Sequence, residues 1–289
     1  MRLAITSPIV TFHPATHGDW ERDGTIEDLA TVAAAADRLG YHHLTCSEHI
    51  GIPAAELDRR GARYWDPLAT FGFLAARTKR IRLATHVLVL GYHHPLEIAK
   101  RYGTLDVVSG GRLVLGVGVG SLREEFDLLG APFEDRGTRG DEALAALRVA
   151  LSGSEPSFHG EHYDFGGMVI DPAAVQERVP IWVGGRTLRS LRRAVELADG
   201  WNPFAVTGPQ VRDWLGRVEL PDSFEVVLST VGELDPLGAP EHTREVLADT
   251  AGFGATIAYP RFEHHSLGHY LESLEALAAL HDPNGGVTS

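Results

Sequence analysis

The sequence predicts a TIM-type (β/α)8 barrel with insertion loops at the C-terminal face of its strands. Three observations favour this fold: β-branched runs alternate with helical patterns, eight strand-like runs can be counted, and 289 residues suit one barrel. An open, doubly wound sheet would also contain parallel strands, and the count of eight units favours the closed barrel. We expect one domain over residues 1–280 and a short tail over residues 281–289.

Each predicted strand is a short apolar run that precedes a helical pattern. The runs are Leu3 to Val10, His42 to Ser47, Ile81 to Leu90, Leu113 to Val119, Ile181 to Val183, Trp201 to Val206, Glu225 to Val231 and Ala255 to Tyr259. After the first run, apolar residues recur at helical spacing from Ile26 to Ala36, with Thr25 and Asp28 as a capping box and Gly40 as a stop. Further helices are expected at Pro67 to Thr78, from Pro95 to Gly110-Gly111, at Asp141 to Leu151 and from Tyr270 to Ala278.

The charge balance argues against several classes of partner. With 26 Lys and Arg residues against 39 Asp and Glu residues, the formal net charge is -13, which repels nucleic acid and anionic lipid. No run approaches the roughly 18 apolar residues of a membrane span. The single cysteine, Cys46, excludes an intrachain disulfide and an all-cysteine metal site. We therefore expect a cytoplasmic protein that acts on a small molecule, with neither a nucleic acid nor a membrane as partner.

Two connections are longer than ordinary turns. Residues His49 to Trp65 follow the second strand and would lie at the C-terminal face of the barrel, where a loop can act as a lid. Residues Pro156 to Pro180 contain aromatic residues around Gly166-Gly167 and are typical of a small hairpin.

Two strand ends carry residues with chemical potential. Glu48 and His49 end the second strand, where an acid beside an imidazole can orient a ligand and donate a proton, or can simply cap and pack. At the fourth strand, glycines alternate from Gly116 to Ser121, which allows either a flat ring or a neighbouring backbone to approach. The third glycine of a dinucleotide fingerprint is missing, so we reject a Rossmann interpretation.

The fifth strand leads into Gly184, Gly185 and Arg186. A Gly-Gly turn that opens a helix presents backbone N–H groups at the positive end of the helix dipole, so this turn predicts a phosphate site, although a solvated helix face is the alternative.

The histidines do not predict a metal site. Adjacent pairs such as His42-His43 point to opposite faces of a strand and cannot easily share one ion. A glycosidase needs two carboxylates at strand ends, and only Glu48 is convincing.

Motifs in one order along residues 1–260 resemble the bacterial luciferase-like oxidoreductase superfamily. They are Ser47-Glu48-His49, Trp65-Asp66-Pro67-Leu68, His94-Pro95, Ser109-Gly110-Gly111-Arg112, Leu115 to Gly120, Arg123-Glu124-Glu125-Phe126, Ile181-Trp182-Val183-Gly184-Gly185 and Asp199-Gly200-Trp201. The compact length resembles the actinobacterial branch that uses coenzyme F420, and the resemblance also implies the barrel fold.

The resemblance assigns roles to individual residues. It implies that His49 is the proton donor or positioning residue near the reactive part of the ring, with Glu48 as the acid beside it. His86-Val87 matches the position of a non-prolyl cis peptide behind the ring. The remaining cofactor-binding residues that it implies are Gly118, Val119, Gly120 and Ser121 along the ring and ribityl chain, and Gly184, Gly185 and Arg186 at the phosphate.

Ser121 stands where some deazaflavin sugar-phosphate dehydrogenases of the superfamily carry a glutamate, which disfavours that substrate. Four residues on loops near strand ends are candidates for the substrate pocket: His13, Trp65, Tyr92 and Trp201.

The resulting hypothesis is an F420-dependent oxidoreductase that transfers a hydride between the deazaflavin C5 and a small organic substrate. One alternative is an FMN-dependent two-component monooxygenase supplied by a separate reductase, and oxygen consumption would distinguish the two. A second alternative is a non-catalytic flavin-binding barrel. The resemblance also implies a homodimer.

Overall fold

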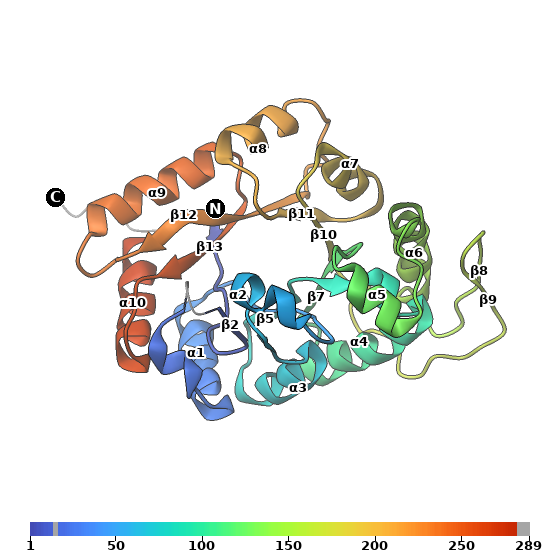
Figure 1. Cartoon of the computed structure of the whole chain (residues 1–289), viewed down its shortest axis with the longest axis horizontal. Helices are drawn as coiled ribbons and strands as arrows, with labels where there is room; N and C mark the ends of the chain where they lie inside the picture. The colour runs from blue at the N-terminus through green and yellow to red at the C-terminus, as the bar shows by residue number, and fades with distance from the viewer. Residues whose placement is uncertain (14–16, 282–289) are drawn as a thin grey trace.

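Eight parallel strands form a closed barrel in the computed structural model, which describes residues 1–13 and 17–281 (Figure 1). A parallel bridge between Ile5, two residues after β1, and Leu44 of β3 closes the barrel between the first and last strands of the sheet. The predicted barrel is therefore confirmed. In their order around the barrel, the strands are β1 (Arg2–Leu3), β13 (Ile257–Phe262), β12 (Glu225–Leu234), β11 (Gly200–Pro203), β10 (Ile181–Gly185), β7 (Leu113–Gly118), β5 (Arg82–Thr85) and β3 (His43–Cys46).

Helices surround the strands, as Figure 1 shows. Local sequence sets their ends: the Thr25 side chain accepts a hydrogen bond from the N–H of Asp28 at the start of α1, and Gly40 ends that helix with φ of 82°. The larger helices are α1 (Ile26–Leu39), α3 (Pro67–Arg77), α4 (Pro95–Ser109), α6 (Arg136–Ala150), α7 (Leu188–Leu197), α8 (Gly208–Leu215), α9 (Pro240–Gly252) and α10 (Leu267–Leu280).

Shorter elements lie in the connections between the barrel strands. The predicted hairpin within 156–180 is present as β8 and β9, whereas α5 was not predicted. The short elements are β2 (Thr11–Phe12), η1 (Asp19–Arg22), η2 (Ala54–Glu56), α2 (Leu57–Arg60), β4 (Arg63–Tyr64), β6 (Leu88–Val89), η3 (Leu90–Tyr92), α5 (Arg123–Leu129), β8 (Phe158–His159) and β9 (Asp164–Phe165).

The core has two parts. Strands and outer helices bury one large apolar cluster between them, and a second cluster is separate from it. The second cluster draws on five of the barrel strands and on Ala4, next to β1, as expected for side chains that fill a barrel. Its members are Ala4, Ala84, Val114, Trp182, Val227, Ile257 and Tyr259.

Among the described residues, no helix is long and apolar enough to cross a bilayer, and no group of three or more His, Cys, Asp or Glu side chains could hold a metal ion. Of the predicted C-terminal tail, only His281 belongs to the described residues.

Candidate active site

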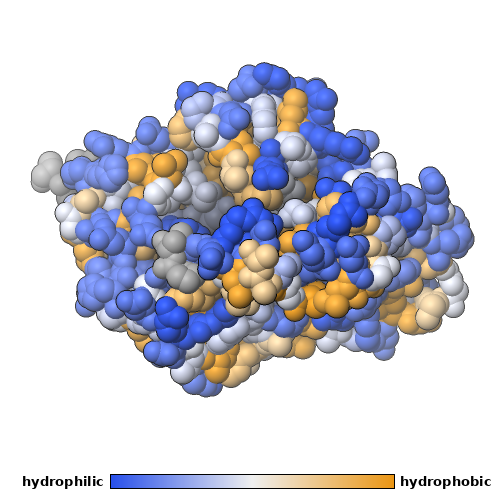
Figure 2. All heavy atoms as spheres, viewed as in Figure 1, coloured by the Kyte–Doolittle hydropathy of each residue, from blue (hydrophilic) through white to orange (hydrophobic). Residues whose placement is uncertain are grey.

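A cavity of about 760 Å³ opens at the C-terminal face of the barrel. Figure 2 shows the surface hollowed between α2 and the long strands β12 and β13. Its size falls in the range of small-molecule sites, roughly 300–1,000 Å³. Strand ends and the 49–65 loop both contribute to its walls, through Ser47, Tyr64, His86, Tyr259 and others.

His86 lies at the wall of this cavity, and its ring packs edge-on against Tyr259 with 5.2 Å between ring centroids. Burial, the main cause, and the charge of Arg261 together lower the pKa of His86 to about 4, against a hydrogen bond with Asn202 that raises it. The imidazole is therefore neutral near pH 7 and cannot serve as the acid of the site. The peptide bond between His86 and Val87 is cis, at the position that the resemblance implies.

Val87 fills the space that the neighbouring glycines leave. A Cβ built on Gly118 would lie 2.8 Å from Val87 Cγ2, and one on Gly184 would lie 2.9 Å from Val87 Cγ1. At Gly116 the neighbouring backbone leaves no room for a side chain, since a Cβ built there would lie 2.0 Å from the Thr85 carbonyl oxygen. The packing interpretation of the glycine spacing fits these contacts, and the ring-binding interpretation stays a prediction.

A buried carboxylate holds His49. The Nδ1 of His49 lies 2.8 Å from Oε2 of Glu125, and the His49 ring packs edge-on against Tyr64 of the cavity wall with 4.4 Å between ring centroids. The Tyr92 hydroxyl donates to the same oxygen at 2.8 Å, and the Ile50 N–H donates to Oε1 at 2.7 Å.

Glu125 is ionised in this network. Burial alone would raise the pKa of its carboxyl group, since only 1% of the side chain is exposed. The hydrogen bonds from His49 and Tyr92 outweigh that effect and lower the pKa below its usual range. An ionised carboxylate can only accept, so the Nδ1 of His49 carries a hydrogen and Nε2 is left for other partners.

Glu48 lies in a different network from His49. One of its carboxylate oxygens accepts from the N–H of Val89, and the other lies 2.7 Å from Nε2 of His93. Glu48 is buried and is absent from the cavity wall. These two contacts fix β6 and the segment after it to the end of β3, and a role for Glu48 beside His49 stays a prediction.

The predicted phosphate turn is intact at the end of β10. Gly185 adopts φ of 149°, and a Cβ there would lie 2.5 Å from that of Ser190. Thr187 caps α7, and its side chain accepts from the N–H of Ser190. The other N–H groups of the first turn have no partner within the helix. Arg186 is exposed beside them.

The residues that follow β7 pack against the neighbouring helices α5 and α6. Val119 contacts the position of Gly140 on α6, where a Cβ would lie 2.6 Å from Val119 Cγ1. Gly120 adopts φ of 77° against the Phe126 ring, and Ser121 is exposed.

One of the four predicted substrate-pocket residues, His13, lines the cavity. Tyr92 holds Glu125, and the Trp65 backbone pairs with Val10. The prediction that Trp201 lines the substrate pocket is wrong, because this side chain is fully buried and its indole N–H donates to Ser190 Oγ on α7 at 3.1 Å. Its side chain points from β11 into the helix layer.

Sequence reasoning missed Glu125, Tyr64 and Arg261. Glu125 belongs to a motif quoted for the resemblance, and it lies 76 residues from His49, so only the fold reveals the contact. Tyr64 lies within the loop expected to form a lid, and Arg261 lies just past the last predicted strand.

A family model described as luciferase-like monooxygenase matches residues 7–220. The chain belongs to this family. The luciferase-like family comprises oxidoreductases and monooxygenases. An uncharacterized protein of Mycobacterium tuberculosis is 35% identical over 183 residues, which cover 59% of this chain and 62% of the relative. The match thus spans less than two thirds of that relative.

Solved structures of two enzymes share the fold. An F420-dependent secondary alcohol dehydrogenase, in complex with an F420-acetone adduct, superposes with a TM-score of 0.77 at 14% identity over 97% of this chain and 99% of that one. The FMN complex of the oxygenating constituent of 3,6-diketocamphane monooxygenase from Pseudomonas putida gives 0.68 at 15% identity over 96% and 97%.

Proposed function

We propose that this luciferase-like protein is a coenzyme F420-dependent oxidoreductase acting on a small organic substrate. The observation that carries the proposal is His49, whose Nδ1 is held by the buried Glu125 carboxylate and whose ring contacts the cavity wall at Tyr64. A tricyclic deazaflavin, when bound, supplies the hydride chemistry.

The residues present suit a ligand that joins a flat ring to a phosphate. Gly118 and Gly184 carry no side chain, so Val87 packs close against both strand ends and would support a ring from behind. Gly185, the first turn of α7 and the exposed Arg186 offer N–H donors and positive charge to a phosphate.

His49 would move the proton of the reaction. Glu125 fixes its tautomer, so Nε2 is the atom that can accept or donate on the side away from the carboxylate. The 49–65 loop, with Tyr64 against His49, would limit the access of water to the reacting atoms. Glu125 is a positioning residue in this mechanism.

Binding titrations test the cofactor. We expect the purified protein to bind F420 at micromolar concentration and FMN more weakly, as followed by ring fluorescence. Arg186→Gln should weaken F420 binding about tenfold, since one charge-assisted contact is lost. The matched control Arg192→Gln removes an exposed arginine further along α7 and should leave F420 binding unchanged. Binding of neither cofactor would refute the proposal.

The second candidate is an FMN-dependent monooxygenase that receives reduced flavin from a separate reductase. The FMN-bound diketocamphane enzyme, which has the same fold, supports it. Preferential FMN binding, with oxygen consumed on addition of reduced FMN, would favour this candidate over the first.

A further inference from the structure

Strands β12 and β13 lie side by side (Figure 1), and Arg261, near the end of β13, lines the cavity. The register between them shifts from Ser229 to Glu233, and Gly232 within this bulge has φ of 74°. Beyond the bulge, Glu233 pairs in register with Arg261. Bulges of this kind redirect side chains next to active sites.

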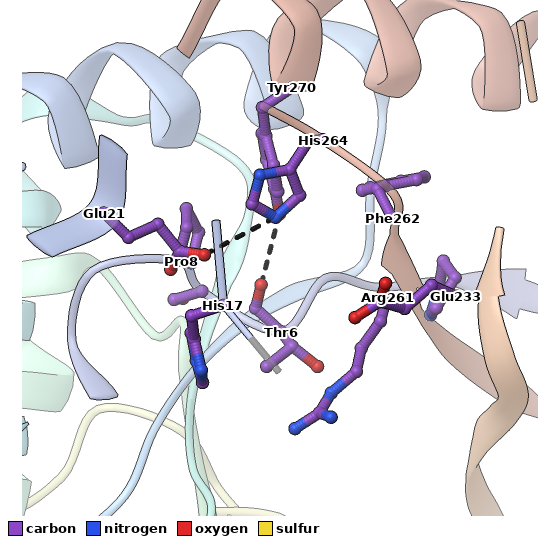
Figure 3. A pocket seen from close by; sticks show the side chains of 11 residues that line it. Thr6, Pro8, His17, Glu21, Glu233, Arg261, Phe262, His264 and Tyr270 are labelled. Atoms are coloured by element: carbon purple, nitrogen blue, oxygen red, sulfur yellow. Dashed lines mark hydrogen bonds and ion pairs between the residues drawn. The ribbon is translucent and has the colours of Figure 1, made fainter. Parts of the chain in front are cut away.

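Among residues 1–13 and 17–281, no carboxylate lies within 4.0 Å of the Arg261 guanidinium, and no oxygen accepts a hydrogen bond from it. Figure 3 shows its side chain pointing away from Glu21 and His264, which face one another in a smaller adjoining cavity. Its charge nonetheless acts on the cavity wall, where it contributes to the lowered pKa of His86. The guanidinium is therefore available to a ligand in the main cavity.

The rest of the cavity wall combines aromatic rings with positive charge. Phe12, Tyr64, Phe204 and Tyr259 present apolar surface. Arg59 and Arg60 also line the cavity, and both pair with the single carboxylate of Glu56. The wall is thus net positive in a chain of net charge -13, although Glu233 opposes this locally.

We propose that the substrate is an organic acid, with an apolar body against these aromatic rings and a carboxylate held by Arg261. This inference rests on the proposed function, because it describes the substrate of the same site. Arg261 also lies away from the phosphate turn, since β11 and β12 separate β13 from β10 around the barrel. The acid group and the cofactor phosphate would then be bound by different cations.

Calorimetric titration of the cofactor-free protein tests the proposal with matched probes: benzoate, phenylacetate and octanoate against their uncharged amides. We expect at least one acid to bind about tenfold more tightly than its amide. Arg261→Gln should abolish that preference, and Glu233→Gln should increase it. The control Arg244→Gln, which removes an exposed arginine on α9, should leave it unchanged.

The proposal is overturned if no acid is preferred over its amide, or if Arg261→Gln keeps the preference. It is also overturned if Arg261→Gln weakens F420 binding as much as Arg186→Gln does, because Arg261 would then belong to the cofactor site. Cofactor binding without any preference for acids would leave the proposed function standing and refute this inference alone. A preference for acids without cofactor binding would refute the proposed function and leave the acid site at Arg261 standing.

Discussion

Replacing Glu125 by glutamine removes one charge and changes almost no volume. Two donors, His49 Nδ1 and the Tyr92 hydroxyl, meet at its Oε2, and the Ile50 N–H meets Oε1. The amide keeps a carbonyl oxygen for the backbone N–H and places an NH2 group opposite the two side-chain donors. Two charge-assisted hydrogen bonds, worth about 1.5–3 kcal/mol each, are lost. Rotation of the hydroxyl and the second imidazole tautomer would recover part of this, so we expect a loss of about 2 kcal/mol.

Urea unfolding at pH 7 measures this loss, with Glu124→Gln as a control on the exposed neighbour. The pKa of Glu125 is lowered in the folded state, so its contribution is present above the unfolded pKa of about 4.5 and is lost as pH falls through the folded pKa. The difference in the free energy of unfolding between wild type and Glu125→Gln should therefore become smaller toward pH 4. Nitrogen NMR of His49 should show hydrogen on Nδ1 in the wild type and a shift toward hydrogen on Nε2 in the variant.

Equal stability of the wild type and Glu125→Gln at pH 7, or an equal loss in Glu124→Gln, would refute the assignment of this energy to the network. An unchanged His49 tautomer would refute the positioning role, whatever the stability.

Three further predictions concern packing and pH. Gly120→Ala should lower the free energy of unfolding by about 2–4 kcal/mol, because Gly120 has a left-handed φ and its Cβ would lie 2.6 Å from the Phe126 ring. The control Gly130→Ala has a left-handed φ but nothing within 4 Å of its Cβ, so in urea unfolding it should lower this free energy by only about 1 kcal/mol. Trp201→Phe should lower the free energy of unfolding by about 1–3 kcal/mol and change F420 affinity by no more than about twofold. A large loss of F420 affinity would contradict this and show that Trp201 belongs to the binding site. For His93, burial would lower the pKa, but the Glu48 carboxylate raises it overall, so its contribution is present below about pH 6.5 and lost as pH rises through the folded pKa. His93→Gln should therefore cost about 1–2 kcal/mol at pH 6 and less at pH 9 by thermal unfolding, and a larger loss at pH 9 would contradict this.

The barrel was predictable because its signal is local and repeated. Each barrel strand from β3 onward overlaps a predicted apolar run, since a buried parallel strand must be apolar on both faces. The first run was less accurate: β1 ends at Leu3, and the chain leaves the sheet apart from the bridge at Ile5. The α5 helix was missed because it spans only Arg123–Leu129 and is rich in charge.

The site was less predictable because its contacts join distant segments. Glu48 and His49 are neighbours in sequence, yet one pairs with His93 and the other with Glu125. Adjacent residues at a strand end point in different directions, so their proximity along the chain does not make them one catalytic unit. Trp201 shows the same limit, since its place in a short strand does not reveal which face of the sheet its side chain takes.

The filled barrel interior has a kinetic consequence. Trp182 and the six smaller or aromatic side chains clustered with it occupy the inside of the barrel among the described residues, so the C-terminal mouth is the route by which molecules reach the cavity. When two ligands share one entrance and one of them binds deeper in the cavity, the deeper ligand has to bind before the other. Steady-state kinetics should then show compulsory order: the ring-bearing partner enters first, and excess substrate inhibits by blocking its entry.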